Sequence, residues 1–333
     1  MSLRFHEIAE SNHRIQNPLS LEKLRLLGEL CHAHEGMRVL DLACGKGELL
    51  CQWAAAHNII GIGVDISAVF IEAAQKRAFE LDVFNQLTFV EADAGDYPQE
   101  HHQFDLISCM GATWIGGGLV GTLNLMATAL KPNGGWLLVG EPYWAETPSD
   151  EVAKVLGVQV DEFATLEGTL DRFESAGLEL VDMTLSSLDE WDRYIASQWN
   201  TIYQWLDENE DDPDAADLRR WIQANRRIYL TTQRQTMGWG AFVLKAQRKA
   251  TRQASSTSSY ENPSRPVAVE FSDGFVWVSL LDGRVIGNPL AWYPWLENAP
   301  QDEQEAFDLD TFGINWRTLG QRLEVDALLR GKG

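Results

Sequence analysis

Cysteine, positive charge and long apolar runs are all scarce in this sequence. Its 4 cysteines form no Cys-x-x-Cys pair, which argues against a zinc knuckle, and so small a number fits a reducing compartment. Only 27 basic residues stand against 49 acidic ones, so the formal net charge is -22. A field of this sign disfavours nucleic acid and anionic lipid as partners and mildly favours a cationic ligand.

No apolar run approaches the ~20 residues that a membrane-spanning helix needs. Residues 1–16 are polar and lack the apolar core of a signal peptide. The acidic run at 207–214 is typical of a solvated turn, because nothing constrains its carboxylates around a metal ion. We therefore expect a cytoplasmic protein with no membrane partner and no metal site.

The sequence does contain 45% apolar residues, and its 333 residues are more than one hydrophobic core usually holds. We therefore expect two domains. In the first half, short apolar runs alternate with amphipathic segments, as in βαβ units. The runs predict strands at 37–43, 59–66, 87–93, 104–110 and 135–143. The amphipathic segments predict helices at 19–34, 47–57, 67–81 and 119–131. The expected fold class is α/β, with a parallel, doubly wound sheet.

The next part of the chain predicts a helical insertion. Residues 150–225 are mostly helical in pattern, with one strand at 178–187. A last strand at 238–247 would pair with it and close the sheet. The first domain is therefore expected at 1–248.

A linker and a small module follow. Ser, Thr, Asn and Pro dominate residues 249–266, which is typical of a linker. Residues 267–333 begin with short strands joined by Asp-Gly turns at 273–274 and 282–283. Helix-like residues 289–299 come next, so we expect a small α+β domain.

The predicted strands end in residues that suit a nucleotide-like ligand. Gly45 and Gly47 follow the first strand, where glycine permits a tight turn and free N–H groups attract an anion. Asp65 ends the second strand, from which a carboxylate can accept both hydroxyls of a ribose. Asp93 ends the third and is placed to receive the amine of an adenine. Open α/β sheets bind ligands at such carboxyl ends.

Five ordered motifs carry a resemblance to a known family: VLDLACGKG, GVDIS, EADAGDYP, FDLISCM and LKPNGGWLLVGEPY. The chain resembles class I S-adenosylmethionine-dependent methyltransferases over 1–248, near a bacterial subgroup of unassigned substrate close to the quinone-biosynthesis type. The resemblance implies a Rossmann-like sheet with a helical cap and S-adenosylmethionine as cofactor. It also implies methyl transfer to a small-molecule acceptor by in-line displacement.

The resemblance implies roles at each strand end. Gly45 and Gly47 would cradle the methionine part, with Asp41 orienting the loop or the amino group. The implied cofactor-binding set is Asp41, Ala43, Cys44, Gly45, Gly47, Asp65, Ile66, Asp93, Ala94, Cys109, Met110 and Gly111. Ala43 departs from the family, since many members have glycine there.

A nicotinamide dehydrogenase is the closest alternative, because it too uses a glycine turn and a ribose-binding acid. Its fingerprint is G-x-G-x-x-G, whereas this chain has Ala43, Gly45 and Glu48 at those positions. A glutamate there would repel the negatively charged pyrophosphate. The sequence therefore favours the methyltransferase.

Acceptor chemistry leaves more alternatives open. The catalytic candidates are Glu141, His13 and Tyr143, and the substrate-binding candidates are Arg14, Trp114 and Trp144. His13 and Arg14 precede the first predicted helix, where an N-terminal lid would cover the cofactor. Glu141 or His13 would accept a proton. Alternatively His13 is simply exposed, Glu141 is structural, and no general base is used.

A helical repeat of aromatic and apolar residues runs from Trp191 through Tyr194 and Ile195 to Leu206. It predicts either a cap helix that lines a flat acceptor pocket or ordinary core packing.

Residues 267–333 contain no histidine or cysteine and resemble short bacterial domains of unknown function. That resemblance implies at most binding of a protein partner or regulation. The alternative function for the whole chain is a non-catalytic S-adenosylmethionine sensor that signals through this domain.

Overall fold

The computed structural model describes residues 2–97, 103–131, 134–246, 264–281, 283–309 and 313–330. It divides into two compact units, residues 1–249 and 250–333. The predicted linker at 249–266 lies mostly outside the described residues, so the expected domain boundaries stay predictions. Among the described residues, no helix combines the length and the apolar character needed to cross a membrane.

The first unit is built on one seven-stranded sheet. Its strands are β1 (Arg38–Leu42), β2 (Ile60–Asp65), β3 (Leu87–Glu91), β4 (Leu106–Met110), β5 (Trp136–Trp144), β6 (Leu178–Leu185) and β7 (Met237–Ala246). They lie in the order β3-β2-β1-β4-β5-β7-β6. Strands β1 to β5 run parallel, and β7 pairs antiparallel with β5 and β6. Since β1 lies between β2 and β4, the strand order reverses there, and a ligand crevice is expected at these carboxyl ends.

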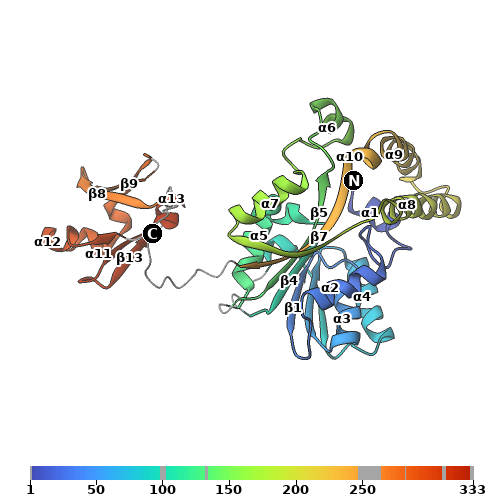
Figure 1. Ribbon diagram of the computed structural model, residues 1–333, viewed down its shortest axis with the longest axis horizontal. Helices are drawn as coiled ribbons and strands as arrows, with labels where there is room; N and C mark the ends of the chain where they lie inside the picture. The colour runs from blue at the N-terminus through green and yellow to red at the C-terminus, as the bar shows by residue number, and fades with distance from the viewer. Residues whose placement is uncertain are drawn as a thin grey trace. The chain divides into compact units, whose positions relative to one another are not determined.

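Helices cover both faces of the sheet, as Figure 1 shows. One face carries α2 (Leu21–Leu30), α3 (Glu48–His57) and α4 (Ala68–Glu80), and the other carries α5 (Leu119–Ala129) and α7 (Leu166–Ser175). The predicted doubly wound α/β fold is therefore confirmed. The shorter helical elements of this part are η1 (Ala94–Asp96), η2 (Thr113–Gly116) and α6 (Asp150–Leu156).

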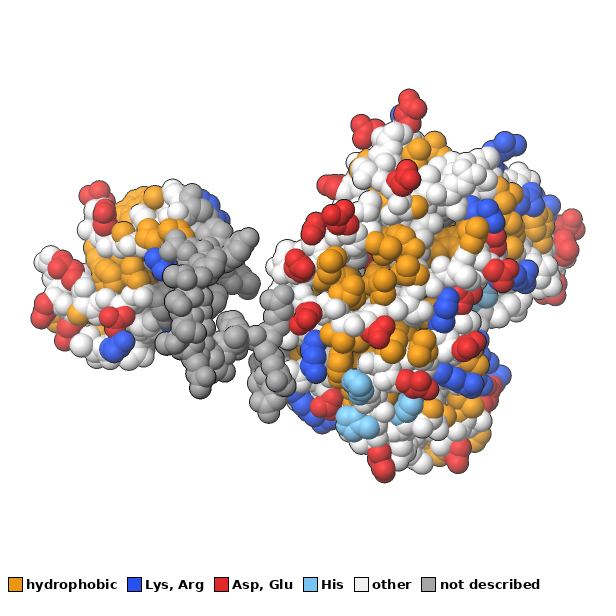
Figure 2. All heavy atoms as spheres, in the orientation of Figure 1, with side chains coloured by type: hydrophobic (Ala, Val, Ile, Leu, Met, Phe, Trp, Pro, Cys, Tyr) orange, Lys and Arg blue, Asp and Glu red, His pale blue; other side chains and the backbone are white. Residues whose placement is uncertain are grey.

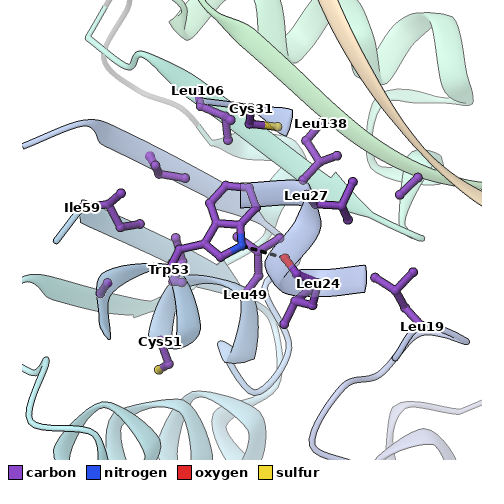
Figure 3. Packing of buried hydrophobic residues seen from close by; sticks show 14 of the residues in the cluster. Leu19, Leu24, Leu27, Cys31, Leu49, Cys51, Trp53, Ile59, Leu106 and Leu138 are labelled. Atoms are coloured by element: carbon purple, nitrogen blue, oxygen red, sulfur yellow. Dashed lines mark hydrogen bonds between the residues drawn. The ribbon is translucent and has the colours of Figure 1, made fainter. Parts of the chain in front are cut away.

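Trp53 of α3 anchors the layer that supports the crevice. The indole is fully buried, and its N–H donates to the Leu24 carbonyl of α2 at 2.9 Å (Figure 3). Leu27 of α2 and Leu138 of β5 belong to the same apolar cluster. Because a hydrogen bond and apolar packing act together, α2 is held against α3 and the sheet.

The N-terminus forms a helix that the sequence analysis did not predict, α1 (Leu3–Ala9). It packs on the cap helices α8 (Leu188–Glu208) and α9 (Ala215–Ile228), where Ile8 shares a buried cluster with Ile202. His13 and Arg14 therefore follow the first helix and do not precede it, which corrects the expected order. A π-helical turn, η3 (Tyr229–Gln233), and α10 (Arg234–Thr236) lead from the cap to β7.

The second unit holds two small antiparallel sheets. The first joins β8 (Pro266–Ser272), β9 (Phe275–Leu280) and β10 (Val285–Pro289), as the Asp-Gly turns predict. The second, which was not predicted, joins β11 (Asp308–Leu309), β12 (Gly313–Trp316) and β13 (Gln321–Glu324). The helical elements are η4 (Leu290–Trp292), α11 (Pro294–Glu297), α12 (Gln301–Gln304) and α13 (Val325–Arg330). Tyr293 and Trp316 lie in its core, whereas Trp277 and Trp292 are exposed.

Candidate active site

A pocket of about 840 Å³ opens at the carboxyl ends of β1, β2 and β4. Its position agrees with the reversal of strand order at β1. It is lined by ten of the twelve expected cofactor-binding residues: Asp41, Ala43, Cys44, Gly45, Asp65, Ile66, Asp93, Ala94, Met110 and Gly111. Gly47 and Cys109 do not line it. Residues from the ends of four strands, β1 to β4, and the loops that follow them thus meet in one cavity.

Three alternate residues of the loop after β1 have left-handed backbone. Ala43, Gly45 and Gly47 have φ values of 55°, 53° and 66°. Glycine adopts this conformation freely, whereas alanine pays about 1–2 kcal/mol, so Ala43 carries local strain. Gly47 serves packing and not ligand contact, because a Cβ there would lie 2.5 Å from the ring of Phe89.

Asp65 ties the glycine loop to the start of α4. Its Oδ2 accepts from the Gly45 backbone N–H at 2.8 Å, and its Oδ1 accepts from the Ser67 N–H at 2.9 Å. Ser67 in turn caps α4 by accepting from the Phe70 N–H. Burial raises the pKa of Asp65 even though these N–H groups favour the carboxylate. A polar ligand group that donates to this carboxylate would relieve its desolvation.

Asp41 is a buried carboxyl that forms no ion pair with any described residue. Ser108 donates to its Oδ1 at 2.7 Å, and Asp41 is 2% exposed. Burial is the main reason that its pKa rises to about 7, and the negative charge of Asp65 adds to the effect. Cys109 lies on β4 in the core beneath the pocket, where burial also raises the pKa of its thiol. An ammonium group bound near Asp41 would therefore favour its ionised form.

Lys46 lies within the glycine loop and fastens the N-terminal segment, residues 2–19, over it. Its Nζ donates to the backbone carbonyls of Glu10, Ser11 and His13 at 2.7, 2.8 and 2.9 Å. These bonds use all three donors of the ammonium group. The Lys46 backbone N–H donates to Gln16 Oε1 at 2.8 Å. Gln16 sits so close that a Cβ on Gly45 would lie 2.0 Å from this oxygen.

Glu10 is the buried centre of a second set of contacts between the N-terminal segment and α8. It accepts from Tyr194 Oη at 2.8 Å and from Gln198 Nε2 at 2.6 Å. His13 Nδ1 lies 2.8 Å from its other oxygen. Burial would raise the pKa of Glu10, but the hydrogen bonds from His13 and Tyr194 outweigh it and hold the pKa below its usual value. The segment is therefore held from both the loop and the cap.

His13 does not reach the pocket, nor is it simply exposed. Its Nε2 contacts Ser197 Oγ, so both ring nitrogens are engaged. The ring also stacks on Tyr194 with centroids 4.9 Å apart. Its structural role is to join the N-terminal segment to α8, and no proton acceptor remains free on it.

Glu141 is not at the pocket either. It is 2% exposed, accepts from Thr113 Oγ1 at 2.6 Å, and has a pKa raised by burial to about 7. Arg14 does not neutralise it, because the Arg14 Nε lies 3.9 Å from a carboxylate oxygen of Glu48. Sequence position at the end of β5 thus placed this carboxyl correctly along the chain but not in the cavity.

The two aromatic candidates after Glu141, Tyr143 and Trp144, do not line the main pocket either. Tyr143 is half-buried with its ring against Gly238, and burial raises the pKa of its phenol. Trp144 is buried and donates to the Val160 carbonyl at 3.0 Å. Neither lines the 840 Å³ pocket.

Arg14 and Trp114, by contrast, do line the pocket, and Trp114 is 74% exposed at its rim. The aromatic and apolar residues of α8 serve both expected purposes, pocket lining and core packing. Trp191 and Ile195 line the pocket, whereas Ile202 packs in the cap core. Pocket residues that sequence reasoning missed include Ser2, Leu3, His6, Ile15, Gln16, Asn17, Pro18, Gln233 and Trp239. The sequence assigned none of them a role in binding, and only the fold brings them to the pocket.

On the face of the first unit that Figure 2 shows, acidic side chains do not gather around one feature. Figure 2 shows Asp and Glu dispersed over the visible face of the first unit. Such dispersal is typical of a charged, soluble surface and gives no patch for a basic partner on that face. Among the described residues, no group of three or more His, Cys, Asp or Glu is arranged to hold a metal ion.

Comparison with known proteins adds to this geometry. Residues 39–134 match a family described as methyltransferase domain, and residues 266–333 match a family described as protein of unknown function (DUF2442). The crystal structure of an S-adenosylmethionine-dependent methyltransferase from Geobacter sulfurreducens, in complex with S-adenosyl-L-homocysteine, has a TM-score of 0.70 and 41% sequence identity. The match covers 73% of this chain and 98% of that one.

Two further relatives span the same region. The protein YjhP of Escherichia coli (strain K12) is 42% identical over 243 residues, which are 72% of this chain and 97% of the relative. The 2-phytyl-1,4-naphtoquinone methyltransferase of Trichormus variabilis (strain ATCC 29413 / PCC 7937) is 29% identical over 205 residues, with 54% of this chain and 86% of the relative covered. With its doubly wound sheet and its motif residues around one pocket, this chain belongs to the family of S-adenosylmethionine-dependent methyltransferases and carries a C-terminal DUF2442 domain.

Proposed function

We propose that this protein transfers a methyl group from S-adenosylmethionine to a small-molecule acceptor held in the same pocket. The observation that carries the proposal is the pair of buried carboxyls, Asp41 and Asp65, beside a glycine loop in one pocket. They fit a ligand that brings an ammonium group, a cationic sulfur and two ribose hydroxyls. A volume of about 840 Å³ leaves space for an acceptor beside the cofactor.

The residues divide the work of binding. Asp65 would hold the ribose, Asp41 the amino group, and Asp93 with Ala94 would flank the adenine. S-adenosylmethionine supplies a methyl group bonded to a sulfonium sulfur. In the transfer this carbon–sulfur bond breaks with its electron pair left on sulfur, a bond to the acceptor atom forms, and the acceptor gives up a proton. The protein's share is to align the two and exclude water.

The proposal assigns no general base to Glu141, His13 or Tyr143, because none of them lines the pocket. Lys46 and Glu10 instead hold the N-terminal segment over the reaction site. Alignment and desolvation are sufficient for a donor that is already reactive, and an acceptor proton can leave to water.

Titration calorimetry with S-adenosylmethionine and S-adenosylhomocysteine tests the donor. We expect saturable one-to-one binding of both, near micromolar affinity. Incubation with a metabolite extract and methyl-labelled S-adenosylmethionine then tests turnover. Labelled small-molecule product supports the enzyme; binding without any labelled product would contradict it and favour the sensor alternative.

The affinity for S-adenosylmethionine is expected to rise with pH. Asp41 has a pKa of about 7, so it is neutral below pH 7 and a carboxylate above it, and only the carboxylate attracts the ammonium group. Between pH 6 and 8 we expect a gain of about tenfold, because the ionised fraction of a carboxyl with a pKa of about 7 rises from about 0.1 to about 0.9 over this range. Calorimetric titration across this range measures it.

The Asp41→Asn variant should bind weakly with no such slope. Glu141→Gln is the matched control, since Glu141 is an equally buried carboxyl with a pKa of about 7 that lies outside the pocket. This variant should keep the slope of the wild type. A slope that survives in Asp41→Asn would remove Asp41 from the binding role.

A further inference from the structure

Gln16 and Asn17 of the N-terminal segment lie over two loops of the pocket at once. The Oε1 atom of Gln16 accepts from the Lys46 backbone N–H of the glycine loop at 2.8 Å. After β4, the Asn17 carboxamide lies so close to Gly111 that a Cβ there would be 2.6 Å from it. In the orientation that satisfies its neighbours, the Asn17 amide donates to the Met110 carbonyl at 3.2 Å. These two side chains therefore cover the loops at which we expect the methionine part of the cofactor.

The methionine part of S-adenosylmethionine ends in an ammonium group and a carboxylate on one carbon atom. Since the proposed pose gives the ammonium group to Asp41, the carboxylate lies close to that negative side chain, and Asp65 of the same pocket adds to the repulsion. A carboxylate in such surroundings is stable only where hydrogen-bond donors face it. The pocket must therefore supply a donor beside the glycine loop.

Several donors around the two loops are already engaged within the protein. The backbone N–H groups of Gly45, Lys46 and Gly111 each donate to a protein oxygen at 2.8 Å. The ammonium group of Lys46 donates to three backbone carbonyls. Arg14 also lines the pocket, but its guanidinium lies 3.9 and 3.7 Å from two carboxylates of the protein. None of these groups is free to receive the cofactor's carboxylate without giving up a protein contact.

The Nε2 atom of Gln16 is a donor that has no hydrogen-bond partner among the described residues, and Gln16 lines the pocket. The Lys46 N–H fixes the orientation of the carboxamide, because only Oε1 can accept this bond. Nε2 lies at the glycine loop, 3.8 Å from the position of a Cβ on Gly45. It is also accessible, since the enclosed and unpaired side-chain atoms of the described residues are Thr169 Oγ1 and Trp191 Nε1.

We propose that Gln16 binds the carboxylate of the cofactor through Nε2, and that the N-terminal segment therefore closes firmly only over ligands that carry this group. The inference rests on the proposed function, whose pose places the methionine part at the glycine loop. With Oε1 on the Lys46 N–H and Nε2 on the carboxylate, one side chain joins the segment, the loop and the cofactor. A ligand without the carboxylate leaves Nε2 unpaired and holds the segment less firmly.

A matched pair of ligands tests this role: S-adenosylmethionine and its decarboxylated form, which differ by the carboxylate alone. Each is titrated calorimetrically into the full chain, and the readout is the dissociation constant of the decarboxylated ligand divided by that of the complete one. Gln16→Glu keeps an oxygen for the Lys46 N–H but replaces the amide donor with a negative oxygen. We expect the ratio to fall at least about tenfold, because repulsion takes the place of a charge-assisted hydrogen bond.

Two further variants separate the hydrogen bond from added charge and from misfolding. Gln233→Glu adds the same charge at another glutamine that lines the pocket, on η3 at the cap side, and it should change the ratio less than about threefold. Gln16→Met removes the donor without adding charge, so the ratio should again fall about tenfold. This variant keeps the test usable should Gln16→Glu not fold.

Hydrogen exchange followed by mass spectrometry measures the closure. Saturating S-adenosylmethionine should protect residues 2–19 of the wild type more than the saturating decarboxylated form does. The difference should disappear in Gln16→Met. A glutamine that merely filled space would affect the protection by both ligands alike.

The assignment is overturned by any of three results: Gln16→Met retains the wild-type ratio, Arg14→Met lowers the ratio further than Gln16→Met does, or both ligands protect residues 2–19 of the wild type equally. Failure of the proposed function is a different result, in which the wild type binds neither ligand. Binding of both ligands with a ratio that Gln16 does not influence refutes the role of this residue alone.

Discussion

Replacing Asp65 with alanine is expected to weaken the binding of S-adenosylmethionine about 100-fold. In the proposed pose the carboxylate accepts two ribose hydroxyls, and hydrogen bonds to a charged acceptor contribute about 1.5–3 kcal/mol each, against the ~2.8 kcal/mol that 100-fold represents. The substitution also frees the Gly45 N–H, which Asp65 Oδ2 holds at 2.8 Å. Loss of the ribose hydrogen bonds and loss of the bond to Gly45 both weaken binding, because the ligand must then also order the glycine loop.

Glu91→Ala provides the control for charge alone. Glu91 is the cross-strand partner of Asp65 in the β2–β3 pairing, is exposed, and does not line the pocket. Its removal changes the local field by the same charge but should alter affinity less than about twofold, since exposed charges are screened. Titration calorimetry with S-adenosylhomocysteine compares the variants, with circular dichroism to establish folding. Equal affinities of folded Asp65→Ala and Glu91→Ala would falsify the ribose role.

Replacing Lys46 with methionine is expected to release the N-terminal segment and weaken cofactor binding at least about tenfold. Methionine has similar length but no donors, so the carbonyls of Glu10, Ser11 and His13 lose the ammonium that gathers them. Each bond to a charged donor contributes about 1.5–3 kcal/mol when one partner is deleted, although the three are not additive. Residues 2–19 supply part of the pocket wall, so their release opens the cavity to water.

Hydrogen exchange followed by mass spectrometry measures the release directly. In Lys46→Met, residues 2–19 should lose protection while β1, β4 and β5 keep theirs. Lys23→Met is the control: its ammonium also donates to a backbone carbonyl, that of Leu185 at 2.8 Å, but it lies outside the pocket. Unchanged exchange in residues 2–19 of Lys46→Met would show that the contacts from Glu10 to α8 suffice without the lysine.

Much of the first unit was predictable because its signals are local. A strand buried on both faces reads as an apolar run, and an amphipathic helix reads as a 3.6-residue repeat, so β1 to β5 and α2 to α5 were expected near their observed bounds. The helix α1 was missed because Leu3–Ala9 has only 7 residues, too few to show a helical repeat, and it is stabilised by packing on α8. The sheet β11 to β13 was missed because its strands have only 2 to 4 residues.

Some residues of the candidate site could also be placed from the sequence, and others could not. Asp41, Asp65 and Asp93 could be placed because each lies at or near the end of a predicted strand, and the ends of parallel strands meet at one edge. Glu141 also lies near the end of a predicted strand, yet its side chain turns into the core toward Thr113. Sequence spacing places a Cα along the chain, but the direction of a single side chain at a strand end depends on what packs around it.

The sequence by itself determined the α/β fold, the glycine loop and the acidic residues at the strand ends, because periodicity and backbone freedom are properties of neighbouring residues. Only the tertiary structure decided which side chains close the pocket. Glu10 meets Tyr194 and Gln198 across 184 and 188 residues of chain, and Lys46 reaches back to residues 10–13. Such contacts depend on how helices pack onto the finished sheet, and no local pattern encodes that packing.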